Sequence, residues 1–249
     1  MATKRSVFAC KQFVVEQHHC AMKVNTDSLI LGSWASPASV TGPILDIGTG
    51  SGILALMMAQ KSQMSSVYAI EIDPDAAQQA DKNFAASPWS KRMNVILMDI
   101  AQFTPTQHYA TIIANPPYFA APISSSRAYI QLNRHRERAR IDHGLSISTL
   151  FHWVAKHLIK NGYFYCLYPA AREAEILSMA KTVNLVCDEL LTVRHSEEKP
   201  AHVVAFKFSQ SEKRVTEYLI NRQTLVIRNQ QAQYSSEFKT LCRDFYLHF

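Results

Sequence analysis

The sequence predicts an α/β fold built around a doubly wound, mostly parallel β-sheet. Apolar runs rich in β-branched and aromatic residues, which are typical of buried strands, alternate with segments whose apolar residues recur at helical spacing. This alternation predicts parallel strands that are joined by crossover helices. A glycine-rich turn follows the first strand, and polar residues follow the next three. The four strands are expected at residues 43–47, 67–72, 93–98 and 109–114.

Length and composition indicate one domain with a short appendage. The chain has 249 residues, of which 47% are hydrophobic, and this is enough for one α/β domain but not for two. We therefore expect an N-terminal extension over residues 1–40 that packs on a domain formed by residues 41–249. No apolar run approaches the roughly 18 residues of a membrane span. The first residues also lack the apolar segment of a signal peptide.

The net charge indicates the kind of partner, and the cysteines indicate the redox compartment. The net charge is +6 and the pI is near 9.1, which suits a polyanionic partner such as a nucleic acid. The five cysteines are scattered and form no CxxC pair, which favours reduced thiols and disfavours a disulfide framework or a zinc site. We expect a cytoplasmic monomer without a bound metal.

The strand at 43–47 runs into the turn Gly48-Thr49-Gly50-Ser51-Gly52. Glycines allow a tight turn and a close approach of the backbone to a ligand at the N-terminus of the next helix. The pattern differs from the dinucleotide-binding fingerprint, whose third glycine would fall at Ile53. It is not a P-loop either, because no Gly-Lys-Ser/Thr occurs here. The turn predicts a binding site for a small ligand.

Polar side chains recur at the ends of successive strands. Asp46 lies beside the glycine turn, and Glu71 ends the second strand at about the 20-residue spacing of a ribose-binding carboxylate. Asp99 follows the third strand and Asn115 follows the fourth. The carboxyl ends of parallel strands meet at one edge of a sheet. We therefore expect a binding cleft at this edge.

The tetrapeptide Asn115-Pro116-Pro117-Tyr118 forms a stiff turn directly after the fourth strand. Neither proline can donate a ladder hydrogen bond, and Asn115 is restricted to an extended conformation because it precedes a proline. The turn brings an amide side chain and an aromatic ring close together. It is either a functional turn in the cleft or a turn that only ends the strand.

A long connection at about 119–145 carries a cluster of basic residues. Loops of this length are usually functional or disordered, although a solvated helical face is an alternative. Residues two apart on a helix point in opposite directions, so alternate arginines cannot share one face, whereas Arg136 and Arg140 can. We expect the cluster to bind RNA phosphates. Its arginines are Arg134, Arg136, Arg138 and Arg140.

The extension also supplies candidates. Short strands are expected at 13–15 and 21–24, and Asn25-Thr26-Asp27 predicts the start of a helix. Thr26 is either a helix cap or a residue that closes over a ligand, and Lys23 is either a solvated end or an RNA contact. Both readings stay open at this point.

Taken together, these motifs resemble class I S-adenosylmethionine-dependent methyltransferases. The resemblance covers residues 20–210 and rests on the segment 45–52, on Glu71, on Asp99 and on Asn115-Pro116-Pro117-Tyr118. It implies a Rossmann-like, seven-stranded sheet. The tetrapeptide is a mark of family members that methylate a nitrogen on a planar amino or amide group. A second, closer similarity links nearly the whole chain to bacterial methyltransferases that act on N6 of adenine 37, beside the anticodon of valine tRNA; it is carried by segments 20–27, 87–89, 136–140 and 234–247.

The resemblance implies a role for each candidate. Glu71 would bind the ribose hydroxyls of S-adenosylmethionine, and Asp99 would accept from its adenine amino group. Asn115 Oδ1 and the Pro116 carbonyl would accept the amino hydrogens of the target base. The other cofactor residues would be Thr26, Asp46, Gly48, Gly50, Gly52, Ile72 and Ile100, and the substrate residues would be Lys23, Tyr118, Phe119 and the four arginines.

Several rival functions remain open at the level of sequence. The same tetrapeptide occurs in enzymes that methylate a protein glutamine, but those carry a larger helical N-terminal domain. Adenines in rRNA or DNA are other possible targets. A non-catalytic RNA-binding protein could keep the fold, and a nicotinamide oxidoreductase is the weakest rival because of Ile53 and the Asn-Pro-Pro-Tyr turn.

Overall fold

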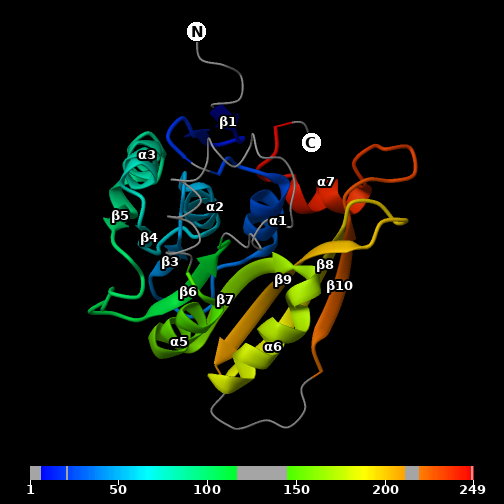
Figure 1. Ribbon diagram of the computed structural model, residues 1–249. Coiled ribbons are helices and arrows are strands. Elements are labelled where there is room, and N and C mark those ends of the chain that lie inside the picture. Colours follow the sequence, from blue (N-terminus) through cyan, green and yellow to red (C-terminus); the bar gives the residue numbers. More distant parts are fainter. Residues whose placement is uncertain (1–6, 21, 117–144, 211–218, 248) are drawn as a thin grey trace, which may run out of the picture.

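The computed structural model describes residues 7–20, 22–116, 145–210, 219–247 and 249 (Figure 1). Its largest element is a β-sheet. The strands are β3 (Ile44–Ile47), β4 (Val67–Glu71), β5 (Met93–Leu97), β6 (Tyr109–Ala114), β7 (Leu158–Pro169), β8 (Leu185–Arg194), β9 (Ala201–Gln210) and β10 (Asn221–Val226). They pair in the order β10-β8-β9-β7-β6-β3-β4-β5.

The predicted fold class is confirmed. Every neighbouring pair of strands is parallel except those that β9 makes with β7 and β8. The chain runs from β3 outward to β5 and then returns to the other side of β3 with β6, so a topological switch point lies between β3 and β6. Ligands bind at such points in open α/β sheets. The expected number of seven strands was wrong, since the described residues form eight.

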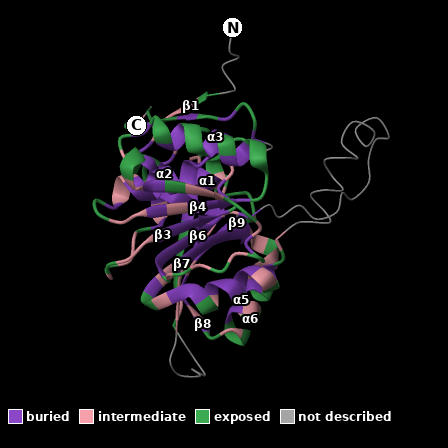
Figure 2. Cartoon of the chain, turned by 90° about the vertical axis from the view of Figure 1, so that its left-hand side faces the viewer, coloured by how far each residue is buried: buried purple, intermediate pink, exposed green. Residues whose placement is uncertain are grey.

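Two layers of helices cover the sheet. One face packs against α1 (Thr26–Trp34), α2 (Ile53–Lys61), α3 (Pro74–Ala85) and α7 (Ser236–Cys242). The other face packs against α5 (Ile147–His157) and α6 (Glu173–Thr182). Figure 2 shows the buried sheet between the two layers. Short 3₁₀ turns lie at η1 (Ser90–Arg92) and η2 (Ala170–Arg172).

The N-terminal extension contacts the C-terminal segment. Strands β1 (Val7–Ala9) and β2 (Val14–Glu16) form an antiparallel hairpin. The backbones of Cys10 and Tyr246 form an isolated antiparallel β-bridge, and the Lys11 amide donates to the Phe245 carbonyl at 3.0 Å. The two ends of the described chain therefore lie together, as Figure 1 also shows.

Three local expectations are settled by the structure. The strand expected at 21–24 is wrong over 22–24, which are irregular. The sequence also predicts a hairpin at about 218–227, which is wrong for the described residues: 221–226 form the single strand β10, which pairs in parallel with β8. The helical spacing of Phe238, Leu241, Cys242 and Phe245 predicts that these residues pack in the core. This is confirmed for Phe238, Cys242 and Phe245, which are at most 2% exposed, whereas Leu241 is only partly buried against the same core.

Two searches of the described segments were negative. No helix there has the length and apolar character needed to cross a membrane. Nor does that part of the chain contain a group of three or more histidine, cysteine or acidic side chains that could hold a metal ion.

Candidate active site

The glycine turn and Asn115 lie at the same edge of the sheet. Ile47, the last residue of β3, pairs in register with Ala114, the last residue of β6. Gly48 and Asn115 therefore leave two adjacent strands at the same level. The switch point of the sheet thus brings together the two motifs that the sequence analysis singled out.

The turn between β3 and α2 has the backbone conformation that glycine favours. Gly48, Gly50 and Gly52 have φ angles of 70°, 57° and 85°. A Cβ atom built on Gly48 or Gly50 would meet nothing within 4 Å, so both face open space. A Cβ on Gly52 would lie 2.5 Å from a ring carbon of Phe84. The first two glycines leave room for a ligand, and the third permits close packing on α3.

Glu71 holds the backbone around the site. Its Oε2 accepts from the Gly50 amide at 2.8 Å, and its Oε1 accepts from the amides of Ile72 and Asp73 at 2.9 and 3.0 Å. The residue is 8% exposed. A carboxylate oxygen has room for a second donor, so Glu71 can also accept from a ligand hydroxyl. The structure adds an anchoring role to the one suggested by spacing.

Asp46 is fully buried beneath the turn. Its Oδ2 accepts from Thr49 Oγ1 at 2.5 Å and from the Ala55 amide at 3.1 Å. Burial raises the pKa of this carboxyl to about 7, although the two hydrogen bonds act in the opposite direction. Its Oδ1 has no hydrogen-bond partner within the described segments.

The Asn115 side chain presents a second unpaired acceptor. Its Oδ1 is buried and has no hydrogen-bond partner among the residues described. Pro116 is buried beside it. A buried polar atom without a partner is costly, and native proteins retain one mainly where function uses it.

The structure separates the residues expected around the cofactor adenine. Asp99 is half-buried, and its Oδ1 accepts from the Ala101 amide at 2.9 Å. Ile72 is 51% exposed at the end of β4, whereas Ile100 is 4% exposed and packs in the core beneath the sheet. Ile72 and the second carboxylate oxygen of Asp99 are therefore accessible to a ligand. Ile100 is almost fully buried, so little of its side chain can contact one.

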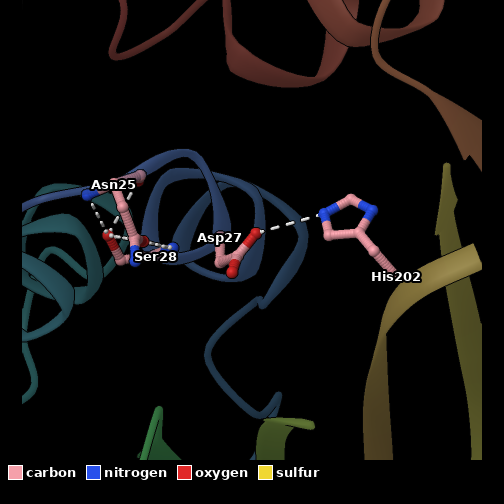
Figure 3. Close-up of polar contacts among 4 residues, drawn as sticks. All are labelled: Asn25, Asp27, Ser28 and His202. Atoms are coloured by element: carbon pink, nitrogen blue, oxygen red, sulfur yellow. Dashed lines mark hydrogen bonds and ion pairs between the residues drawn. The ribbon is translucent and has the colours of Figure 1, made fainter. Parts of the chain in front are cut away.

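Asn25 caps α1, so neither Thr26 nor Asp27 is its N-cap residue. Asn25 and Ser28 form a capping box, in which Asn25 Oδ1 accepts from the Ser28 amide at 2.9 Å (Figure 3). Thr26 is exposed, and so is Lys23 in the preceding irregular segment. Asp27 Oδ1 lies 3.4 Å from His202 Nε2, so α1 is joined to the start of β9.

Several residues that shape the site were not predicted from the sequence. Thr49 and Asn83 hold the glycine turn through side-chain hydrogen bonds, and His202 contacts Asp27. In the sequence, these roles could have been suggested only by polar residue types: Thr49 within the glycine turn, and Asn83 on the buried face of an amphipathic helix. The remaining predicted site residues lie outside the described part of the chain: Tyr118, Phe119, Arg134, Arg136, Arg138 and Arg140.

Solved structures share this fold. A predicted O-methyltransferase from Agrobacterium tumefaciens superposes with a TM-score of 0.66 at 15% identity, covering 88% of this chain and 96% of that one. A glycopeptide N-methyltransferase, MtfA, complexed with S-adenosylmethionine superposes with a TM-score of 0.52 at 13% identity, covering 78% and 98%. At these identities the likeness concerns the fold alone.

The residues present fit S-adenosylmethionine. The open space beside Gly48 and Gly50 gives the ligand room against the backbone. The Asp46 Oδ1 atom, which has no hydrogen-bond partner among the described residues, suits a ligand that carries positive charge and hydrogen-bond donors. The Glu71 carboxylate at the same edge suits hydroxyl groups.

Sequence comparisons identify the family. The model of the methyltransferase small domain matches residues 18–136. A tRNA1(Val) (adenine(37)-N6)-methyltransferase from Pectobacterium carotovorum is 39% identical over 99% of this chain and 96% of its own length. One from Pseudoalteromonas atlantica is 38% identical over 99% of this chain and 100% of its own length. The chain therefore belongs to the family of bacterial tRNA1(Val) (adenine(37)-N6)-methyltransferases, and S-adenosylmethionine is its cofactor.

Proposed function

We propose that this enzyme transfers a methyl group from S-adenosylmethionine to N6 of adenine 37 in tRNA1(Val). The observation that carries the proposal is that Asn115 Oδ1, at the sheet edge shared with the glycine turn, is buried and has no hydrogen-bond partner among the described residues. An acceptor in this position suits an amino group, which has hydrogens to donate. The names of the full-length relatives supply the RNA and the position within it.

The difficulty of the reaction lies in the nucleophile. The lone pair of an adenine amino nitrogen is delocalised into the ring, while the bound cofactor supplies an activated methyl group. Asn115 Oδ1 and the Pro116 carbonyl would each accept one amino hydrogen. These two bonds orient the lone pair and stabilise the positive charge that grows on the nitrogen. No general base is required, because the methylated nitrogen becomes acidic and releases its proton afterwards.

The cofactor contacts are part of the proposal. The turn at 48–52 would hold the methionine end with Asp46 beneath it, Glu71 would hold the ribose, and Asp99 the adenine amino group. Ile72 would cover one face of the adenine, and Ile100 would support the other from the core. Thr26 would close the site from the extension. Exposure of Thr26 and Ile72 supports these assignments.

The RNA contacts extend the proposal beyond the described residues. Tyr118 would stack on the target base with Phe119 beside it, and Lys23 would contact the RNA backbone together with Arg134, Arg136, Arg138 and Arg140. We further propose that residues 1–40 form an extension on a catalytic domain of residues 41–249, and that the protein acts as a monomer in the cytoplasm. The contacts of β2 with α3 and of α1 with α2 support the packing of the extension.

The decisive test is nucleoside mass spectrometry on tRNA. Purified enzyme should convert adenosine to N6-methyladenosine in a tRNA1(Val) transcript, and a transcript with guanosine at position 37 should stay unmodified. The matching cellular experiment compares tRNA from cells with and without the gene. Methylation of the substituted transcript, or of rRNA, DNA or a protein glutamine in its place, would overturn the proposed substrate.

A further inference from the structure

Asn83 is a buried residue in the last turn of α3, and its side chain makes hydrogen bonds to two other segments. The residue lies on α3 and is 3% exposed. Its Nδ2 donates to the Glu16 carbonyl and to the Ser51 carbonyl, both at 2.8 Å, and its Oδ1 accepts from the Glu16 amide at 3.0 Å. Both amide hydrogens and the carbonyl oxygen are therefore in use. One side chain joins the extension strand β2 to the glycine turn.

The rest of this helix face reinforces the junction. Phe84, the next residue, packs so closely on Gly52 that a Cβ there would lie 2.5 Å from its ring. The end of the glycine turn is thus fixed by the packing of Phe84 on Gly52 and by the hydrogen bond from Asn83 to the Ser51 carbonyl. Because Glu16 is held in the same way, β2 and the turn cannot move independently while these bonds persist.

The chain that follows β2 forms a loop whose Cys20 is influenced by Glu71, the residue that we assign to the cofactor ribose. Gln17, 5% exposed, accepts from the Val24 amide at 2.7 Å and closes the intervening loop. Cys20 lies in this loop, and its pKa is raised to about 11, first by burial and then by the negative charges of Glu71 and Asp73. The negative charge of Glu71, the carboxylate that holds Gly50, therefore acts on this loop.

We propose that Asn83 is a positioning residue for cofactor binding, and that it makes the extension a wall of the cofactor site. It acts through Glu16 and Ser51, not by touching the cofactor. If Asn83 is truncated to alanine, Glu16 and Ser51 lose their partners and the extension can move relative to the glycine turn. Thr26, which follows the loop, would lose its fixed position with it.

Calorimetry of S-adenosylhomocysteine binding tests the proposal. The Asn83→Ala variant should bind roughly 10-fold more weakly, as expected when buried hydrogen bonds lose one partner. Gln79→Ala is the matched control, because Gln79 is 2% exposed on the same helix and makes no hydrogen bond to Glu16 or Ser51. Unchanged affinity in Asn83→Ala, or an equal loss in Gln79→Ala, would overturn the proposal. The measurement needs no RNA, so its outcome is independent of the proposed substrate.

Thiol alkylation distinguishes local movement from general instability. All five cysteines are buried in the native protein. In Asn83→Ala, peptide mass spectrometry should find Cys20 alkylated faster, while Cys166 and Cys242, both 0% exposed, stay protected. Equal labelling of all three would mean that Asn83 only stabilises the whole fold, and the positioning role would be rejected.

Discussion

At the scale of single residues, Asn115 Oδ1 is buried and accepts no hydrogen bond from the part of the chain that the structure describes. Asn115→Ala should lower kcat by roughly 100-fold, because the group acts on charge that develops only in the transition state. Cofactor affinity should change little. Steady-state kinetics on tRNA1(Val) and calorimetry with S-adenosylhomocysteine measure the two effects separately. A variant with normal turnover would remove Asn115 from the mechanism.

Asp46 predicts a pH dependence of stability. Its pKa rises from 3.8 to about 7 on folding because the carboxyl is buried. A raised pKa means that the folded state prefers the neutral acid. The contribution of Asp46 to stability is therefore complete below about pH 4 and is lost as the pH rises through about 7.

The Asp46→Asn variant isolates this effect, because its side chain stays neutral. From pH 4.5 to pH 8, its free energy of unfolding should increase relative to that of the native protein by about 3 kcal/mol. Urea unfolding of both proteins without cofactor, at several pH values, measures the difference. A difference that stays constant with pH would show that Asp46 is not protonated on folding.

The sequence predicted which residues gather at the site better than it predicted their hydrogen bonds. Asp46, Glu71, Asp99 and Asn115 were expected at one sheet edge because the ends of parallel strands meet there. That Asn25, not Thr26 or Asp27, caps α1 depends on reciprocal bonds with Ser28. That Glu71 accepts from Gly50 depends on how β3 and β4 are aligned, which a single strand does not reveal.

At the scale of elements, the glycine turn offers a comparison between two positions with similar backbone and different surroundings. Gly48→Ala adds a methyl group in open space, so only the strain of a positive φ should lower stability, by about 1 kcal/mol. Gly52→Ala adds the same strain and a clash with Phe84, so the loss should reach about 2–4 kcal/mol. Chemical denaturation measures both.

Cofactor binding should show a different pattern. Because the space beside Gly48 is where we propose that the cofactor lies, Gly48→Ala should weaken binding despite its small effect on stability. Calorimetry checks this expectation. Equal unfolding free energies for the two variants would mean that Phe84 moves aside without cost, and native affinity in Gly48→Ala would place the cofactor elsewhere.

The elements themselves were predictable where the pattern is local. β3, β4, β5 and β6 lie within a residue or two of their expected ranges, because each is a short apolar run bounded by turn residues. β10 was not, because four of its six residues are polar and its place depends on pairing with β8. Residues 22–24 have strand-like composition but no neighbouring strand to pair with in the described sheet.

At the scale of the whole molecule, the net charge of +6 and the basic cluster at 134–140 predict the salt dependence of RNA binding. Arg136→Glu combined with Arg140→Glu should weaken tRNA binding most strongly at low salt and spare cofactor affinity. Each lost phosphate contact should reduce the log–log salt slope by about 0.7–0.9. These two positions lie outside the described residues, so the prediction comes from the sequence.

Filter binding at several salt concentrations tests the double variant. Lys156→Glu with Lys181→Glu is a control of equal charge, since both lysines are exposed near the C-terminal ends of α5 and α6. Those helix ends lie at the edge of the sheet opposite the glycine turn. Equal slopes for the two double variants would mean that total charge, and not the arginine cluster, governs binding.

The contact between the two ends of the chain has a consequence for biosynthesis. Cys10 bridges to Tyr246, and Leu29 to Leu31 of α1 share a core with Phe238 and Phe245. A ribosome completes these partners more than 200 residues after it has made the first segment. The N-terminal segment and α1 therefore lack these neighbours until residues 238–246 have been synthesised. Because we propose that the extension is a wall of the cofactor site, we expect that site to be complete only after residues 238–246 have been made.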